Sequence, residues 1–458
     1  MDPAAAISTE DELKGYFEPG AKPRERWGMG LEYERLGVFA DTGLCVPYEG
    51  PVSVESLFHE LSRNHGWTIE SELGRPLGLK RGEVHITLEP GGQVEMSGAV
   101  HRALSGLRDE VTAFVAEIDA ISLPMGIAWL GLGLHPFSAL ADIQFIPKSR
   151  YRIMSEYLPR RGSRAHVMMK QTASIQLNLD YGSEGDAMEK LRTAMAVSPL
   201  ITALYAHSPL TEGRLNGMMS YRAWAWRDTD PDRCGLLPFA FKDGAGFQDY
   251  LDYALDVPMF FVARGDTYTF ARGMSFRKFI RKGFEGMRPT LADFELHLTT
   301  LFPEVRLKRY LEIRGMDSGD PASCLSLAAL WKGLLYDGAA RRSAWELVRE
   351  MSFREREALL DAAIRLGPLA PVPGGRTSRT GSPLLARDLL IDLVRLARQG
   401  LNNQGAPDEA AHLDRLDRRL GGEGGCPAYR LAAAWEGDLQ RDPRKLITYL
   451  TRAGADHP

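Results

Sequence analysis

The segment TASIQLNLDY, residues 172–181, alternates strictly between polar and apolar side chains. The polar set consists of Ser174, Gln176, Asn178 and Asp180. Successive side chains of a β-strand point to opposite faces, so this pattern predicts a strand with one apolar face and one polar face. The chain must therefore fold around a sheet that carries a polar surface.

Other stretches of the chain repeat this period of two and carry charged groups. Their polar positions are Glu32 and Glu34 in LEYER, His85, Thr87 and Glu89 in VHITLE, Gln93 and Glu95 after a Pro-Gly-Gly turn, and Glu312 and Arg314 in YLEIR. If all these strands lie side by side in one sheet, their carboxylates meet Gln176, Asn178 and Arg314 on one surface. The apolar face is then free to pack on helices.

Helical spacing of apolar residues separates these strands. It occurs at 53–66, 104–121, 186–209 and 383–401. Strands scattered among helices and joined by tight turns favour an antiparallel sheet with helices on one side. We therefore predict an α+β fold with a curved antiparallel sheet and helices on its convex side. We expect one catalytic domain over residues 1–458, mainly helical from about 325, with a Pro-, Gly- and Ser-rich loop at 367–383.

The composition narrows the class of protein. With 44% apolar and 25% charged residues the chain can bury a large core, and its net charge of -4 gives no long-range attraction to nucleic acid. The chain has no run of about 18 apolar residues, so no membrane span is expected. Its acidic start, MDPAAAISTEDELKG, is unlike a secretory signal, and its four cysteines form no CxxC pair. We expect a cytoplasmic protein.

A surface with so many carboxylates requires a cation. Carboxylates that lie close together raise one another's pKa unless positive charge is placed among them. Mg²⁺ suits such a surface because it prefers oxygen ligands at ~2.0–2.1 Å and leaves positions for water and phosphate. A polar sheet face can also be merely solvated, and for one segment alone that is the more frequent case. The several segments together favour a metal site that binds phosphates.

Known nucleotide-binding and zinc-binding motifs are missing from the sequence. His59 and His65 lie six apart, so HExxH does not occur, and GLGLHP lacks the third glycine of a dinucleotide fingerprint. There is also no GxxxxGK[ST] loop. A nucleotide would therefore be held by metal ions and basic side chains. Arg150 and Arg222 lie next to aromatic residues, where a guanidinium can bind a carboxylate through two hydrogen bonds.

A series of longer motifs resembles the plant-type glutamate–cysteine ligases, a family shared by plants and many proteobacteria. The motifs are WGMGLEYERLGVF, PGGQVEMSG, IPKSRYRIM, SIQLNLDY, SPLTEGRLNGMMSYRAWAWRDTDPDRCGLLPF and YLEIRGMD. The resemblance implies a glutamine synthetase/guanido kinase-like catalytic fold. It also implies the first step of glutathione synthesis, in which ATP drives the joining of the γ-carboxylate of glutamate to the amine of cysteine.

The resemblance further implies roles for individual residues. Two or three Mg²⁺ ions would be bound by Glu32, Glu34, Glu89, Glu95 and Glu312. Glutamate would be bound by Arg150, Arg222 and Thr172, and nucleotide phosphates by Gln176, Asn178 and Arg314. Arg314 and Glu95 would be the catalytic residues. The expected partners are glutamate, cysteine and ATP, with no nucleic acid or membrane, and the protein would be a monomer or a homodimer.

The chain departs from the family pattern at three positions. It has Gln171 where the family usually has Arg, and Leu31 and Tyr33 where the family has a small residue and His or Lys. The metal carboxylates remain, so activation of glutamate is expected to persist. These changes leave two alternatives open, which are a γ-glutamyl ligase with another amine acceptor and a non-catalytic relative that binds nucleotide or glutamate.

Overall fold

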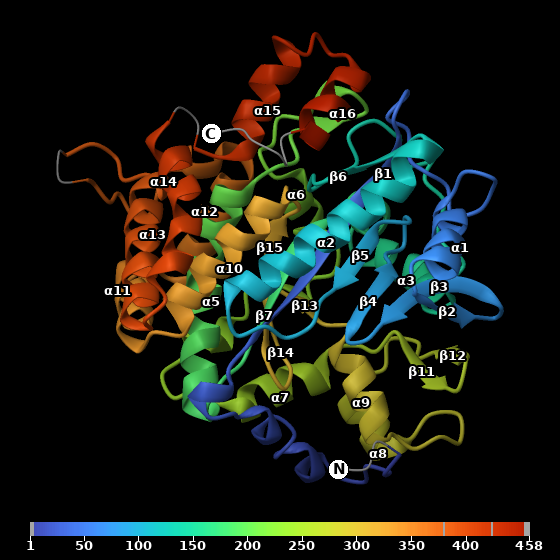
Figure 1. Cartoon of the computed structure of the whole chain (residues 1–458). Coiled ribbons are helices and arrows are strands. Elements are labelled where there is room, and N and C mark those ends of the chain that lie inside the picture. The colour runs from blue at the N-terminus through green and yellow to red at the C-terminus, as the bar shows by residue number, and fades with distance from the viewer. Residues whose placement is uncertain (1–3, 379–380, 423–424, 453–458) are drawn as a thin grey trace.

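A nine-stranded sheet forms the centre of the molecule (Figure 1). The computed structural model describes residues 4–378, 381–422 and 425–452. The strand order is β14-β15-β7-β1-β5-β4-β3-β2, and β6 pairs with the far end of β1. The strands are β1 Met29–Phe39, β2 Thr68–Glu72, β3 Arg75–Arg81, β4 Val84–Leu88, β5 Val94–Ser97, β6 Ile127–Leu130, β7 Ser174–Leu179, β14 Val305–Leu307 and β15 Leu311–Asp317.

Every pairing within this sheet is antiparallel, so the predicted α+β fold with an antiparallel sheet is confirmed. The register places the polar positions directly opposite one another. Glu34 of β1 faces Glu95 of β5, and Glu32 of β1 faces Gln176 of β7. Glu312 of β15 faces Asn178 of β7. Four strands therefore present one continuous polar surface.

Three long helices cover the apolar face of the sheet. They are α2 Leu104–Ser122, α5 Glu184–Tyr205 and α10 Pro321–Leu335. Figure 1 shows α2 and α10 lying across the strands, and α5 packs against β15. Tyr33 points to this side, where its ring meets Phe114 of α2 edge-on and its hydroxyl donates to the Gly319 carbonyl at 2.7 Å. Most of α5 is buried around its whole circumference, as expected for a helix inside a large core.

The polar face is covered as well, which the sequence did not indicate. Its cover consists of short elements, α3 Ser149–Tyr157, α4 Ala165–Gln171, α6 Tyr221–Trp226 and the hairpin β11 Phe261–Arg264 with β12 Thr267–Phe270. α1 Val54–Asn64 packs instead against α2 and β3, and the remaining short elements are α7 Phe247–Asp256, α8 Phe276–Lys282, α9 Leu291–Leu298, β8 Leu210–Thr211, β9 Arg214–Leu215, β10 Cys234–Gly235 and β13 Phe302–Pro303. The polar surface therefore forms one wall of a cavity.

After α10 the described part of the chain contains helices and no further strand. They are α11 Gly338–Val348, α12 Phe353–Leu366, α13 Ala386–Asn403, α14 Asp414–Gly421, α15 Pro427–Glu436 and α16 Pro443–Arg452. The predicted loop at 367–383 starts with a 3-10 turn, Gly367–Leu369, and makes bridges from Pro371 to Leu385 and from Thr377 to Pro383. Residues 379 and 380 of this loop lie outside the described residues.

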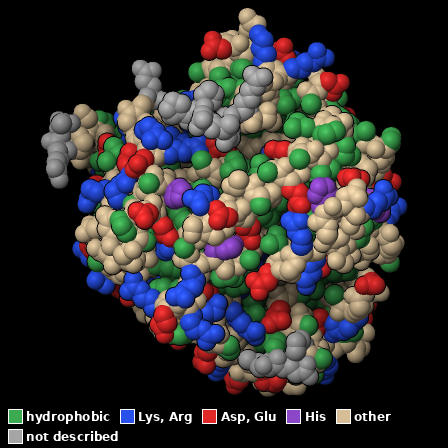
Figure 2. Space-filling view, in the orientation of Figure 1, with side chains coloured by type: hydrophobic (Ala, Val, Ile, Leu, Met, Phe, Trp, Pro, Cys, Tyr) green, Lys and Arg blue, Asp and Glu red, His purple; other side chains and the backbone are tan. Residues whose placement is uncertain are grey.

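On one face of the molecule, no single charge dominates the surface. Acidic and basic side chains are interspersed over the face that Figure 2 shows. Among the described residues, no helix is long and apolar enough to cross a membrane.

Candidate active site

A cavity of about 350 Å³ lies between the polar face of the sheet and its cover. Its walls contain most of the residues that the sequence singled out, namely Glu32, Glu34, Glu89, Glu95, Arg150, Thr172, Gln176, Arg222 and Arg314. Glu312 and Asn178 do not line it but bond directly to residues that do. The structure thus gathers these side chains from six separate stretches of sequence.

The Glu34 carboxylate is held by β7. Ser174 donates to it through its backbone nitrogen at 2.7 Å and its hydroxyl at 2.9 Å, and Gln176 Nε2 donates at 3.1 Å. Burial raises the pKa of Glu34 to about 7, with a further contribution from the negative charge of Glu89. The hydrogen bonds fix the direction of this carboxylate without supplying the positive charge that its burial calls for.

The neighbouring carboxylates on β1 and β5 share this shortage of positive charge. Glu95 accepts hydrogen bonds from Ser97 at 2.8 Å and Thr87 at 3.2 Å, and Glu32 accepts one from Asn178 at 3.0 Å. Burial raises the pKa of both, and repulsion from nearby carboxylates adds to it, chiefly from Glu312 for Glu32 and from Glu32 for Glu95. Each would be stabilised in its charged form by a cation in the cavity.

This set of donors fits a hard divalent cation. The ligands offered are carboxylate oxygens, and the buried Asn178 Oδ1 has no hydrogen-bond partner among the described residues. Within the described ranges, no three acidic, imidazole or thiol groups already converge as they would in a complete protein site. Mg²⁺ needs no such cage, because it commonly uses one or two carboxylates together with water and substrate phosphates.

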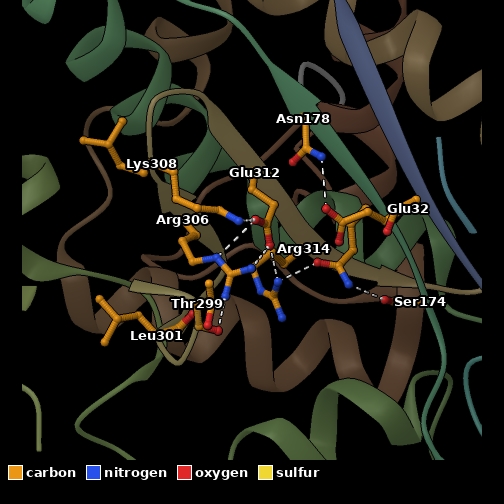
Figure 3. Close-up of polar contacts among 12 residues, drawn as sticks. Glu32, Ser174, Asn178, Thr299, Leu301, Arg306, Lys308, Glu312 and Arg314 are labelled. Carbon is orange, nitrogen blue, oxygen red and sulfur yellow. Dashed lines mark hydrogen bonds and ion pairs between the residues drawn. The ribbon is translucent and has the colours of Figure 1, made fainter. Parts of the chain in front are cut away.

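Glu312 differs from the other carboxylates because three cations surround it (Figure 3). Arg306 Nη2 donates to it at 2.5 Å, Lys308 Nζ lies 2.9 Å from its Oε2, and Arg314 Nη1 also bonds to it. Burial alone would raise its pKa, but these three charges lower the pKa well below its ordinary value. Glu312 therefore stays ionised and anchors a positively charged cluster beside the cavity.

The sequence interpretation missed Arg306 and Lys308. Both belong to VRLKR, where they alternate with Val305 and Leu307, so the period of two was present. The strand β14 is only three residues long, which is too short for this period to stand out. Arg306 is fixed further by bonds to the carbonyls of Thr299 at 2.7 Å and Leu301 at 2.9 Å.

Arg314 connects the positive cluster to the centre of the cavity. Its Nη1 donates to Gln176 Oε1 at 2.6 Å while it also bonds to Glu312. Gln176 in turn donates to Glu34. This chain of bonds runs from the cationic side to the carboxylate side, so a phosphate placed between them would meet Arg314 first.

Arg222 and Arg150 enter the cavity from its cover. Arg222, on α6, is buried and donates to the Arg314 carbonyl at 2.9 Å, and burial lowers its pKa. Asp317, held by Ser208 and Ser220, lies close enough to offset part of that effect. Arg150, on α3, bonds to the Tyr151 hydroxyl at 3.1 Å and leaves its Nε without a partner among the described residues.

Further residues of the cover line the cavity without any signal in the sequence. They are Lys148, Tyr151, Met154, Met168, Trp226, Phe261 and Phe302. Burial lowers the pKa of Lys148 to about 8, with a contribution from the charge of Arg150. These side chains come from short helices, short strands and loops with no repeating pattern, so only the folded chain identifies them.

The three departures from the family pattern lie outside this cavity. Leu31 and Tyr33 are buried on the opposite face of β1, against the helices. Gln171, the last residue of α4, points away and donates to the Ser138 carbonyl at 3.0 Å. None of the three lines the cavity walls.

A second cavity of about 410 Å³ adjoins the first. The two share Arg222, Trp226, Phe302 and Arg314 as a common wall. The far side of the second cavity carries Glu304, whose pKa is raised by burial and whose Oε2 has no partner among the described residues. The space beside the carboxylates is therefore larger than one ligand needs.

A carboxylate-lined cavity on an antiparallel sheet, faced by arginine and lysine, is the arrangement of an ATP-dependent ligase that activates a carboxylate. The fold is similar to that of a solved Francisella tularensis glutamate–cysteine ligase in complex with AMP, with a TM-score of 0.56 at 12% identity over 94% of this chain and 89% of that one.

The sequence comparisons narrow this class to one family. The profile described as glutamate-cysteine ligase family 2 matches residues 28–444, so the chain belongs to that family. It is 41% identical over 437 residues to glutamate–cysteine ligase B, chloroplastic, of Oryza sativa subsp. japonica, covering 94% of this chain and 85% of that protein. It is 38% identical over 434 residues to the chloroplastic glutamate–cysteine ligase of Arabidopsis thaliana, covering 94% and 80%.

Proposed function

We propose that the protein uses ATP to join the γ-carboxylate of glutamate to the amine of cysteine, with the 350 Å³ cavity as its active site. The observation that carries this proposal is the division of the cavity into two sides. Buried carboxylates with raised pKa values form one side, and Arg306 and Arg314 form the other, with Lys308 next to them on Glu312. Metal-bound phosphates fit between two such sides.

Glu32, Glu34, Glu89 and Glu95 would hold two or three Mg²⁺ ions, with Glu312 next to them. Bound Mg²⁺ would offset the negative charge of the nucleotide phosphates and of the transferring phosphoryl group. Gln176 and Asn178 already bond to Glu34 and Glu32, so they would orient these ligands. The raised pKa values support this assignment, because a cation restores the charged form of each carboxylate.

Arg150, Arg222 and Thr172 would bind glutamate. The two guanidinium groups reach the cavity from α3 and α6. Each has the planar geometry that pairs with a carboxylate through two hydrogen bonds. They would direct the γ-carboxylate of the substrate toward Arg314 and the nucleotide.

The reaction would proceed in two displacements. An oxygen of the γ-carboxylate attacks the terminal phosphorus of ATP, ADP leaves, and an acyl phosphate forms. Arg314, supported by Arg306 and Lys308, stabilises the charge on the phosphoryl oxygens during transfer. The neutral amine of cysteine then attacks the acyl carbon, and inorganic phosphate leaves. The cover of the cavity limits hydrolysis of the acyl phosphate because it excludes bulk water.

Cysteine is the proposed acceptor even though the chain departs from the family pattern. Gln171, Leu31 and Tyr33 lie outside the cavity walls, so they do not contact an acceptor bound there. The lining itself keeps the residues that the family resemblance requires.

The test is a product assay by mass spectrometry. The purified protein is incubated with ATP, Mg²⁺ and glutamate, and with cysteine or one of a panel of other amines. We expect γ-glutamylcysteine and one ADP per product, with loss of both on chelation of Mg²⁺ by EDTA and recovery when Mg²⁺ is restored. Absence of γ-glutamylcysteine above background, or a larger yield with another amine, would refute the acceptor assignment.

We also propose that the protein acts as one catalytic unit in a reducing compartment, the cytoplasm, as a monomer or homodimer. Cys45, Cys234, Cys324 and Cys426 are all free thiols. Burial raises the pKa of Cys45, Cys234 and Cys426 to about 12, so these thiols stay protonated and unreactive. Cell fractionation and light scattering test the compartment and the number of subunits.

A further inference from the structure

A third, smaller cavity of about 70 Å³ lies where α10 begins, between α14 and α15. It shares no lining residue with the two cavities described above. Its walls contain three arginines, Arg415, Arg419 and Arg430, and one carboxylate, Asp320. Positive charge therefore exceeds negative charge around this space.

Asp320 is already fully engaged within the protein. It caps α10 by accepting hydrogen bonds from Ser323 N and Ser323 Oγ, both at 2.8 Å, and Arg415 binds both of its oxygens. Burial alone would raise its pKa, but the bonds and charge of Arg415 lower the pKa to about 2. One carboxylate thus neutralises one arginine, and the other two remain without an acidic partner in this cavity.

Arg419 is the least satisfied of these arginines. It is 7% exposed, and its Nη2 makes a long hydrogen bond of 3.3 Å to the Ser323 hydroxyl. Within residues 4–378, 381–422 and 425–452, its Nε and Nη1 have no hydrogen-bond partner. Burial and the nearby charge of Arg415 lower its pKa to about 10, so it is still charged at neutral pH. A buried guanidinium with two unused donors lacks an anion.

We propose that this cavity, which we call the Arg419 site, binds a small tetrahedral oxyanion of the size of phosphate or sulfate. A water molecule needs roughly 10–15 Å³ of such volume, so about 70 Å³ has room for roughly five to seven non-hydrogen atoms, enough for the five of a phosphate or sulfate ion. Arg419 supplies the two unused donors and Arg430 supplies charge at the rim. His207 also lines the site and is neutral, because burial lowers its pKa to about 4.

The test compares three full-length proteins, the wild type, Arg419→Met and Arg418→Met. Arg418 is the exposed arginine one position earlier in α14, so its substitution removes the same charge without touching the cavity. Melting temperature is measured against increasing sodium sulfate, with sodium chloride at equal ionic strength as reference. We expect sulfate to stabilise the wild type and R418M, and R419M to show an apparent affinity lower by roughly tenfold or more.

The active-site cations also attract sulfate, but that contribution is common to all three proteins. An undiminished sulfate response in R419M would therefore overturn the proposal. If R419M fails to fold, Arg430→Met at the exposed rim provides the same comparison. Acetate in place of sulfate tests the geometry, and an equal response to acetate would refute the tetrahedral assignment. Selenate soaked into crystals of the wild type should give an anomalous peak within hydrogen-bonding distance of the Arg419 guanidinium, and its absence would also contradict the proposal.

Discussion

Replacement of Glu312 by Gln tests whether one buried carboxylate organises the positive side of the active site. The side chain is fully buried, and it forms ion pairs with Arg306, Lys308 and Arg314 at once. Gln has nearly the same shape but no charge, so three buried cations lose their common counter-ion. Removing one partner from a buried ion pair costs about 3–5 kcal/mol, and we expect the free energy of unfolding in the absence of ligands to fall by at least about 3 kcal/mol.

Unfolding in urea is monitored by circular dichroism, and the midpoint and slope of the transition are fitted for the wild type, E312Q and a control variant. Glu285→Gln is the matched control, because it removes the same charge from an exposed pair with Arg272. Such exposed pairs contribute about 0–1 kcal/mol, so the control should remain close to the wild type. ADP release in the presence of glutamate and cysteine is measured on the same preparations.

The two readouts separate the two roles of Glu312. We expect E312Q to lose stability and to release no ADP above background, even at temperatures where it is still folded. A loss of stability below about 1 kcal/mol would show that the three cations do not depend on this carboxylate. Unchanged ADP release would show that the phosphates bind elsewhere, and the proposed active site would then be wrong.

Two further predictions concern substrate binding and acid stability. Arg222→Lys loses the planar guanidinium that pairs with a carboxylate, so KM for glutamate should rise roughly tenfold or more while KM for ATP stays within about twofold. The control is Arg214→Lys, at an exposed arginine, which should leave both constants unchanged. Equal effects on both substrates in steady-state assays would refute the role of Arg222 in binding glutamate. Burial lowers the pKa of His297 to about 4, below that of the unfolded chain, so its contribution to stability is complete above about pH 6.5 and is lost as the pH falls toward 4. We therefore expect the free energy of unfolding, measured with urea, to fall between pH 7 and pH 4 by about 3 kcal/mol less in His297→Gln than in the wild type. An equal fall in the two proteins would contradict this.

The polar face of the sheet could be predicted because a strand imposes a strict period on its side chains. Once Glu32 and Gln176 were assigned to polar faces, an antiparallel sheet had to bring such faces together, and the register places these two residues opposite each other. What the period cannot give is the order of the strands. That order decides that Glu312 lies beside Asn178 and that Arg306 and Lys308 come next to it.

The strands β2 and β3 were not predicted, for a local reason. TIESELGRPLGLKR does not alternate regularly, and the register of the pair shifts between Glu70 and Ser71. The turn between the strands has positive φ at both Leu73 and Gly74. Leucine rarely adopts that conformation, so the sequence gives little sign of a tight turn there. The hairpin owes its place to pairing with β4 rather than to its own pattern.

The departures from the family show how the same period constrains function. Leu31 and Tyr33 alternate with Glu32 and Glu34, so a strand that directs the glutamates into the cavity must direct these two residues away from it. The structure places Tyr33 against Phe114 of α2, where its hydroxyl bonds to Gly319 at 2.7 Å. A polar family residue at this position would lie under the helices as well. The difference in chemistry at 31 and 33 therefore acts on the packing of the sheet against its helices, whereas Arg222 and Trp226 belong to the lining of the cavity itself.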